Sequence, residues 1–203
     1  MASTMIHLYL AHKINPDGCG SYFIGSFAPD TFDNKRGDAR AAKRKNHFRD
    51  TPTGDTEKAK LVKFYSQIDK SNPFHIGYFI HLLCDLWWHA AIDKIAEDSG
   101  DKQGWYDNLK NEYRTAGIWI RKNMPWVDDV FRKMEACIND FQSPTTDPTR
   151  EEIASYTKGL LSPSLRESDK NSSGNPPAIL TPAFLESYAA ENAERYMLWI
   201  SDK

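Results

Sequence analysis

The sequence has few cysteines and no pair of them at a metal-binding or redox spacing. Cys19, Cys84 and Cys137 are the three cysteines among 203 residues, and they are widely separated. An odd number without a Cys-x-x-Cys motif suggests neither a disulfide framework nor a thiolate zinc knuckle. Because such a chain suits a reducing compartment, we expect a cytoplasmic protein.

Long apolar runs and an excess of one charge are also missing. The longest apolar run, 76–88, is too short to span a bilayer and contains His81 and Asp85. The N-terminal stretch has no basic region before its apolar residues, so we predict no signal peptide. The formal net charge of -2 argues against a stable nucleic-acid partner. With 40% hydrophobic residues the chain can bury one core, and we expect a single domain over residues 1–203.

A convincing strand pattern is absent as well, and the periodicity indicates helices. Pro125 divides one long helical stretch in two or kinks it. Residues 15–54 read as a long irregular connection, which in a compact domain is unusual unless it is functional, and residues 162–177 read as a polar surface excursion. We expect an all-α, single-domain bundle of about six to eight helices around a central buried His-x-x-x-Asp helix. The predicted helices cover about 4–14, 56–68, 73–97 and 104–141, and two more begin near 150 and 182.

The most informative stretch is Gly77-Tyr-Phe-Ile-His81-Leu-Leu-Cys-Asp85-Leu-Trp-Trp-His89. Residues four apart are offset by about 40° round a helix, so His81 and Asp85 share a face and His89 drifts along the same side. An isolated carboxylate buried among Leu, Ile and Trp costs several kcal/mol unless a positive group meets it. A divalent metal would supply this positive charge. The alternative is that His81 and Asp85 form a buried hydrogen-bonded pair that only stabilises the helix.

All six histidines fall in the first 89 residues, so any metal site is built from the N-terminal half. Histidine with carboxylate and no cysteine favours a catalytic site over a structural one. His7 and His12 share the first helix and point about 140° apart, so one should face the core and the other solvent. His89 is either a residue that supports the ligands or part of the core.

The order His7, Phe27-Ala-Pro-Asp30, His47 and Gly77-Tyr-Phe-Ile-His81-Leu-Leu-Cys-Asp85 resembles the zinc-dependent phospholipase C family, which is related to the S1/P1 nucleases. The resemblance covers roughly residues 5–90. It implies an all-helical fold with a metal cluster that hydrolyses phosphate esters. Carried over residue by residue, it implies that Asp30, His47, His81 and Asp85 hold one metal. His7 and the shared carboxylate of Asp85 would hold a neighbouring one.

The resemblance makes zinc the default ion, although nitrogen and oxygen ligands also accept iron and manganese. The family's third metal uses later histidines, and none follows His89 here, so we expect one or two ions. His7 is preferred to His12 because it follows Met5-Ile6, as in the family pattern. Two ions would activate a bridging water and polarise a phosphoryl oxygen, and Asp30 is the candidate to orient or deprotonate that water.

A run of positive charge lies between the candidate ligands. It reads Lys35-Arg36-Gly-Asp-Ala-Arg40-Ala-Ala-Lys43-Arg44-Lys45 and is followed by Arg49. Arginine suits phosphate because its planar fork gives paired hydrogen bonds. Arg36, Arg40 and Arg49 are therefore candidates to bind an anionic phosphate ester, and a solvated loop without a specific role is the alternative.

The sequence thus favours a metal-dependent hydrolase of phosphate esters, acting on a phosphodiester or a phospholipid head group. A metal-holding protein without turnover and an interaction module for acidic partners are the other two readings. Lipid head groups and nucleotides are not distinguished, and no amphipathic membrane-docking helix stands out.

Overall fold

The computed structural model describes residues 3–33, 35–49 and 54–201, which form ten α-helices, one short 3-10 helix and no β-strand. The predicted all-α fold is confirmed, with more helices than the six to eight expected. Among the described residues, no helix is both long enough and apolar enough to cross a bilayer. The helices are α1 (Thr4–Ile14), α2 (Gly20–Gly25), η1 (Ala28–Asp30), α3 (Ala39–Asn46), α4 (Gly54–Gln67), α5 (Pro73–Asp98), α6 (Lys102–Asn123), α7 (Val127–Cys137), α8 (Arg150–Leu160), α9 (Pro163–Lys170) and α10 (Pro182–Ser201).

Helix ends follow the capping residues in the sequence. The side chain of Asn72 accepts the backbone N–H of Phe74 at 3.0 Å and caps α5. Thr149 and Glu152 form the reciprocal capping box that begins α8. Pro125 lies in the break between α6 and α7, so it separates two helices and does not kink one.

The irregular connection predicted over residues 15–54 is wrong, because this segment contains α2, η1 and α3. The surface excursion predicted over residues 162–177 likewise contains α9. Five of the six residues of α2 are buried, and no residue of α3 is. α2 is covered on nearly all sides. α3 has no buried residue, and its half-buried positions carry alanine, lysine and asparagine. Neither helix therefore has the apolar stripe by which a helix is recognised in sequence.

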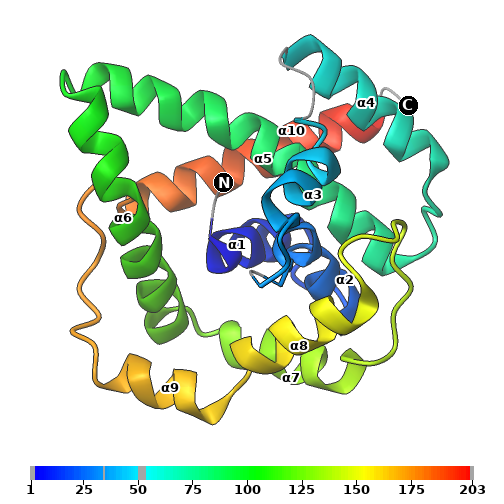
Figure 1. Ribbon diagram of the computed structural model, residues 1–203. Helices are drawn as coiled ribbons and strands as arrows, with labels where there is room; N and C mark the ends of the chain where they lie inside the picture. The colour runs from blue at the N-terminus through cyan, green and yellow to red at the C-terminus, as the bar shows by residue number, and fades with distance from the viewer. Residues whose placement is uncertain (1–2, 34, 50–53, 202–203) are drawn as a thin grey trace.

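Helix α1 occupies the middle of the molecule, with the other helices arranged around it (Figure 1). Its residues 5–11 are all buried, His7 among them. α1 packs against α2, α5, α6 and α10. Because neighbours cover this helix on every side, a polar side chain in its middle lies in the interior of the protein.

Helices α2 and α5 approach each other closely at two glycines. A Cβ atom on Gly77 would lie 2.0 Å from the backbone oxygen of Tyr22, and one on Gly25 would lie 2.3 Å from the backbone oxygen of Phe74. Glycine is required where two backbones meet at such a distance. The contact holds Ser26, at the end of α2, next to the buried part of α5.

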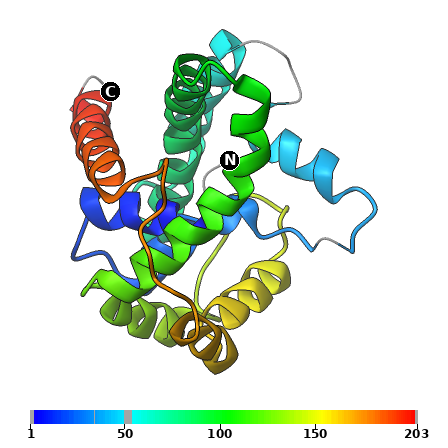
Figure 2. The same ribbon diagram turned by 90° about the vertical axis from the view of Figure 1, so that its left-hand side faces the viewer.

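Helix α3 is placed differently from its neighbours. Figure 2 shows it standing away from the body of the molecule at the end of a long loop. It buries none of its residues, and it packs against η1. Its attachment to the rest of the protein therefore depends on polar contacts more than on apolar burial.

We expect Gly77→Ala to lower the free energy of unfolding by about 3 kcal/mol, because the added methyl group overlaps a backbone atom that cannot move without shifting α2. Gly159→Ala is the matched control, since a Cβ there meets nothing within 4 Å. Gly159 lies in the last turn of α8, and its replacement by alanine should be neutral or stabilising by up to about 1 kcal/mol. Urea unfolding measures both values, and equal stabilities of the two variants would contradict the close approach of α2 and α5.

Candidate metal centre

Five of the predicted site residues meet in the interior, although they come from four separate segments. His7 lies on α1, Asp30 ends η1, His47 follows α3, and His81 and Asp85 lie on α5. They form two overlapping groups, Asp30–His47–His81 and His7–His81–Asp85. Within each group the candidate ligand atoms lie within 4.8 Å of one another. The N-terminal half of the chain thus supplies a cluster of the composition that a divalent metal needs.

The rings of His47 and His81 point their Nε2 atoms at each other, 3.1 Å apart. The other nitrogen of each ring is held by backbone: Nδ1 of His47 donates to the carbonyl of Lys43 at 2.7 Å, and Nδ1 of His81 donates to that of Ser26 at 2.9 Å. Because a carbonyl oxygen only accepts, both Nδ1 atoms carry the proton. In the neutral rings both Nε2 lone pairs then face the same point, which a cation would stabilise.

Two of the histidines are held in the neutral form that binds metals. Burial lowers the pKa of His81 well below its ordinary value, because the charged ring would lose its hydration. Burial also lowers the pKa of His7, and the nearby carboxylates Asp85 and Asp30 offset only part of this effect. Metal ligands must be deprotonated, so these environments prepare the rings for an ion.

The two carboxylates are held in the ionised form. Burial raises the pKa of Asp30, but the ammonium of Lys43 and the rings of His81 and His47, which are still protonated in the acid range where this carboxyl ionises, outweigh burial and hold that pKa well below its usual range. Burial likewise raises the pKa of Asp85, and the protonated rings of His7 and His81 more than reverse this and lower it to about 2. Both groups therefore remain negative ligands at neutral pH.

Asp85 lies between two histidines. Its Oδ1 is 3.5 Å from Nε2 of His7, and its Oδ2 is 3.7 Å from Nε2 of His47. A carboxylate with one oxygen directed to each of two rings suits a ligand shared by two neighbouring ions. The ring of His7 also stacks on that of His81, with centroids 3.8 Å apart.

Several buried atoms of the cluster have no hydrogen-bond partner among the residues described. They include both ring nitrogens of His7 and Oδ1 of Asp85. Buried polar atoms are normally hydrogen-bonded, so unused ones are specific signals. Unpaired polar atoms gathered at one place are typical of a site for an ion or an ordered water.

Two cationic side chains reach the same carboxylates. Nζ of Lys43 lies 2.8 Å from Oδ1 of Asp30, and Nη2 of Arg49 lies 3.3 Å from Oδ2 of Asp85. Charge balance alone therefore does not require a metal. What favours an ion here is the pair of opposed ring nitrogens, together with the ring nitrogens of His7, which these cations leave unpaired. Sequence reasoning missed Lys43 within its basic run, although Lys43 and His47 share one helical face by their spacing of four.

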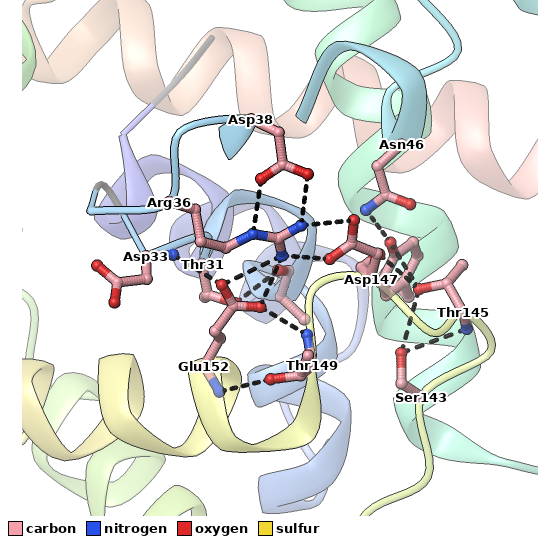
Figure 3. A network of polar contacts seen from close by, with 12 residues as sticks. Thr31, Asp33, Arg36, Asp38, Asn46, Ser143, Thr145, Asp147, Thr149 and Glu152 are labelled. Atoms are coloured by element: carbon pink, nitrogen blue, oxygen red, sulfur yellow. Dashed lines mark hydrogen bonds and ion pairs between the residues drawn. The ribbon is translucent and has the colours of Figure 1, made fainter. Parts of the chain in front are cut away.

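The three arginines predicted to bind substrate have different surroundings. Arg49 lies at the cluster, and Arg40 is exposed on α3. The guanidinium of Arg36 is enclosed by the carboxylates of Asp38, Asp147 and Glu152, at 2.5 to 3.2 Å (Figure 3). The structure therefore brings one of the three arginines to the candidate ligands.

The remaining histidines lie outside both ligand groups. His12 stacks on Trp126 with ring centroids 4.4 Å apart, so His7 is the histidine of α1 that faces the cluster. Nδ1 of His75 accepts the backbone N–H of Asp69 at 3.2 Å. His89 is partly buried and its Nε2 has no hydrogen-bond partner in the described chain.

We expect stability to fall as the pH drops from about 6.5 towards 4, with His89 as one cause. Burial, aided by the charge of Arg49, lowers the pKa of His89 from 6.5 to about 4. At a pH between these two pKa values, His89 is protonated in the unfolded chain and neutral in the folded protein, so a lower pH favours unfolding. We therefore expect the free energy of unfolding of the metal-free wild type to fall between about pH 7.5 and 5. For His89→Gln this fall should be smaller by about 1 kcal/mol. Urea titrations at both pH values test this, and parallel losses would exclude His89.

Binding of a metal is expected to order α3 selectively. His47 directly follows α3, which buries none of its own residues, so an ion held by His47 would tie this helix to the interior. We expect zinc to slow amide exchange in residues 40–46 by at least about tenfold, and to change the buried middle of α5 little. Hydrogen–deuterium exchange with and without a chelator measures this. Equal protection of every helix would contradict the link through His47.

Comparison with protein-family models, with curated proteins and with solved structures gives no match to this chain. The resemblance to the phospholipase C family therefore stays a prediction. The functional argument rests on the geometry of the buried His/Asp cluster.

Proposed function

We propose that this protein is a metal-dependent hydrolase of phosphate esters, similar to the zinc-dependent phospholipases C. The observation that carries the proposal is the pair of buried Nε2 atoms of His47 and His81, 3.1 Å apart, with both Nδ1 protons held by carbonyls. Two carboxylates and a third histidine surround the pair. Histidine and carboxylate without thiolate are the ligands of catalytic zinc. Zinc is the ion we propose, as one or two ions; iron and manganese accept the same ligand set.

A metal bound here would polarise a phosphoryl oxygen and lower the pKa of a water towards about 7. The protein must then orient that water. Asp30 is the residue we propose for this role, because its carboxylate lies beside both His47 and Lys43. Since its pKa is held well below the usual range, this carboxylate is a weak base. That favours orientation of the water by an accepted hydrogen bond over removal of its proton.

The cations at the cluster support an anionic substrate. The side chains of Lys43 and Arg49 are 25% and 20% exposed, whereas those of His81, Asp85 and Asp30 are 0%, 1% and 10% exposed. A phosphate group that arrives from solvent would therefore meet positive charge first. We propose phosphodiesters as the substrate class, phospholipid head groups included.

A metal-binding protein without turnover is the second candidate. The observation that favours it is the near-complete burial of the ligands, since structural metal sites are closed and catalytic sites keep an open position. The two candidates differ in one measurable property, which is hydrolysis by the metal-loaded protein.

The test is hydrolysis of bis-p-nitrophenyl phosphate and p-nitrophenyl phosphate by the full chain, with metal content measured by elemental analysis. We expect turnover with zinc or manganese, its loss with a chelator, and its return when metal is added. Asp30→Asn should lower kcat by at least about a hundredfold. Asp33→Asn, at an exposed position three residues on, is the matched control and should keep its turnover.

Two outcomes would count against the proposal in different ways. A metal-replete protein that is inactive on a broad panel of phosphoesters would leave the non-catalytic role. An Asp30→Asn protein that keeps both its metal and its full turnover would remove Asp30 from the mechanism.

A further inference from the structure

Lys43 contacts the metal-ligand cluster through both its backbone and its side chain. Its carbonyl accepts the Nδ1 proton of His47 at 2.7 Å, and its ammonium lies 2.8 Å from Oδ1 of Asp30. A spacing of four residues puts Lys43 and His47 on one face of α3. The lysine thus orients one candidate ligand and neutralises another.

The oxygen that Lys43 contacts is the one that a metal would need. Oδ1 of Asp30 is also 3.2 Å from Nε2 of His47 and 3.8 Å from Nε2 of His81. A divalent ion held by these three atoms would share Oδ1 with the ammonium of Lys43. Two positive charges on one oxygen repel each other strongly in a buried setting, so ion and ammonium compete.

Lys43 is freer to leave the cluster than Arg49. Arg49 binds two carboxylates, those of Glu57 and Asp85, with its planar fork. Among the residues described, Lys43 has one carboxylate contact, and its side chain is 25% exposed. A lysine ammonium sits on a flexible four-carbon stem, so it can move while its backbone stays in place.

We propose that Lys43 is an exchangeable counterion of the metal centre. Its ammonium pairs with Asp30 until a divalent cation takes that carboxylate, and the displaced ammonium then binds a phosphate oxygen of the substrate at the outer side of the cluster. The second half of this inference rests on the proposed hydrolase function. No covalent step is involved, because one ion pair replaces another.

This exchange couples the two binding events. Before metal binds, the ammonium is neutralised by Asp30 and attracts phosphate weakly; afterwards it is available. By thermodynamic reciprocity, phosphate must then increase the affinity for metal by the same factor. Lys43 would thereby make occupancy of the metal site a condition for capture of the substrate.

The experiment compares Lys43→Met with Lys45→Met in the full-length chain. Lys45 is exposed on the same helix, so its variant removes the same charge and serves as the control. Calorimetric titration with zinc should give at least about tenfold tighter binding for Lys43→Met than for the wild type. Titration of the zinc-loaded protein with inorganic phosphate should give at least about tenfold weaker binding. Lys45→Met should stay within about twofold of the wild type in both titrations.

Lys43→Gln provides a second test if Lys43→Met does not fold without metal, because an amide can still donate a hydrogen bond to Asp30. It should shift both affinities in the same directions. If the wild type binds zinc and neither neutral variant binds it more tightly, the inference is overturned and the proposed function stands. If the neutral variants bind zinc more tightly but bind phosphate as the wild type does, the proposed contact between Lys43 and the substrate's phosphate is overturned. Absence of zinc binding by the wild type and every variant overturns the proposed function and this inference together.

Discussion

The arrangement of the His/Asp cluster depends on which nitrogen carries the proton in two of its imidazole rings. Nδ1 of His81 and Nδ1 of His47 each donate to a backbone carbonyl, of Ser26 and Lys43, and this turns both Nε2 atoms inward. The carbonyl of Lys43 accepts the backbone N–H of His47 at 3.1 Å as well as the ring proton, so one oxygen fixes both the backbone and the ring of this ligand. The ligands are thus oriented by backbone that lies outside α5, the helix with the recognisable motif.

The packing of α2 on α5 brings this backbone into place. Gly25 and Gly77 allow the two helices to approach so closely that Ser26 reaches His81. A glycine outside the ligand set is thereby part of the site. The residues that would bind the metal and those that set its geometry are different, and only the former carry an obvious chemical signal.

The sequence was sufficient to predict structure where the candidate ligands follow the period of a helix. His81 and Asp85 lie four apart on a buried helix that Asn72 caps, and this helix could be predicted from its own residues. The meeting of these two ligands with Asp30, His47 and His7 was implied only by the resemblance to the phospholipase C family, and the structure brings the five residues together. α2 and α3 could not be predicted, because α2 is buried on nearly all sides and α3 has no buried apolar residue. The role of Lys43 depends on where its flexible side chain reaches, and that is fixed by tertiary structure.

The environment of Arg36 shows the same limit. Its partners Asp147 and Glu152 lie more than a hundred residues further along the chain, so their approach follows from the whole fold and from no local pattern. Phosphate binding was the plausible prediction for an arginine in a basic run. In the structure this guanidinium is already occupied by carboxylates (Figure 3).

Glu152 contributes to the capping box of α8, contacts Arg36, and accepts the backbone N–H of Asp33 at 3.0 Å. It therefore fastens the segment that joins Asp30 to His47 onto a helix that carries no ligand. In a random-mutagenesis screen, substitutions of Glu152 would therefore give the same phenotype as substitutions in the His/Asp cluster itself. Genetic mapping of this protein would thus outline a functional region that extends into its C-terminal half, well beyond the atoms able to touch an ion.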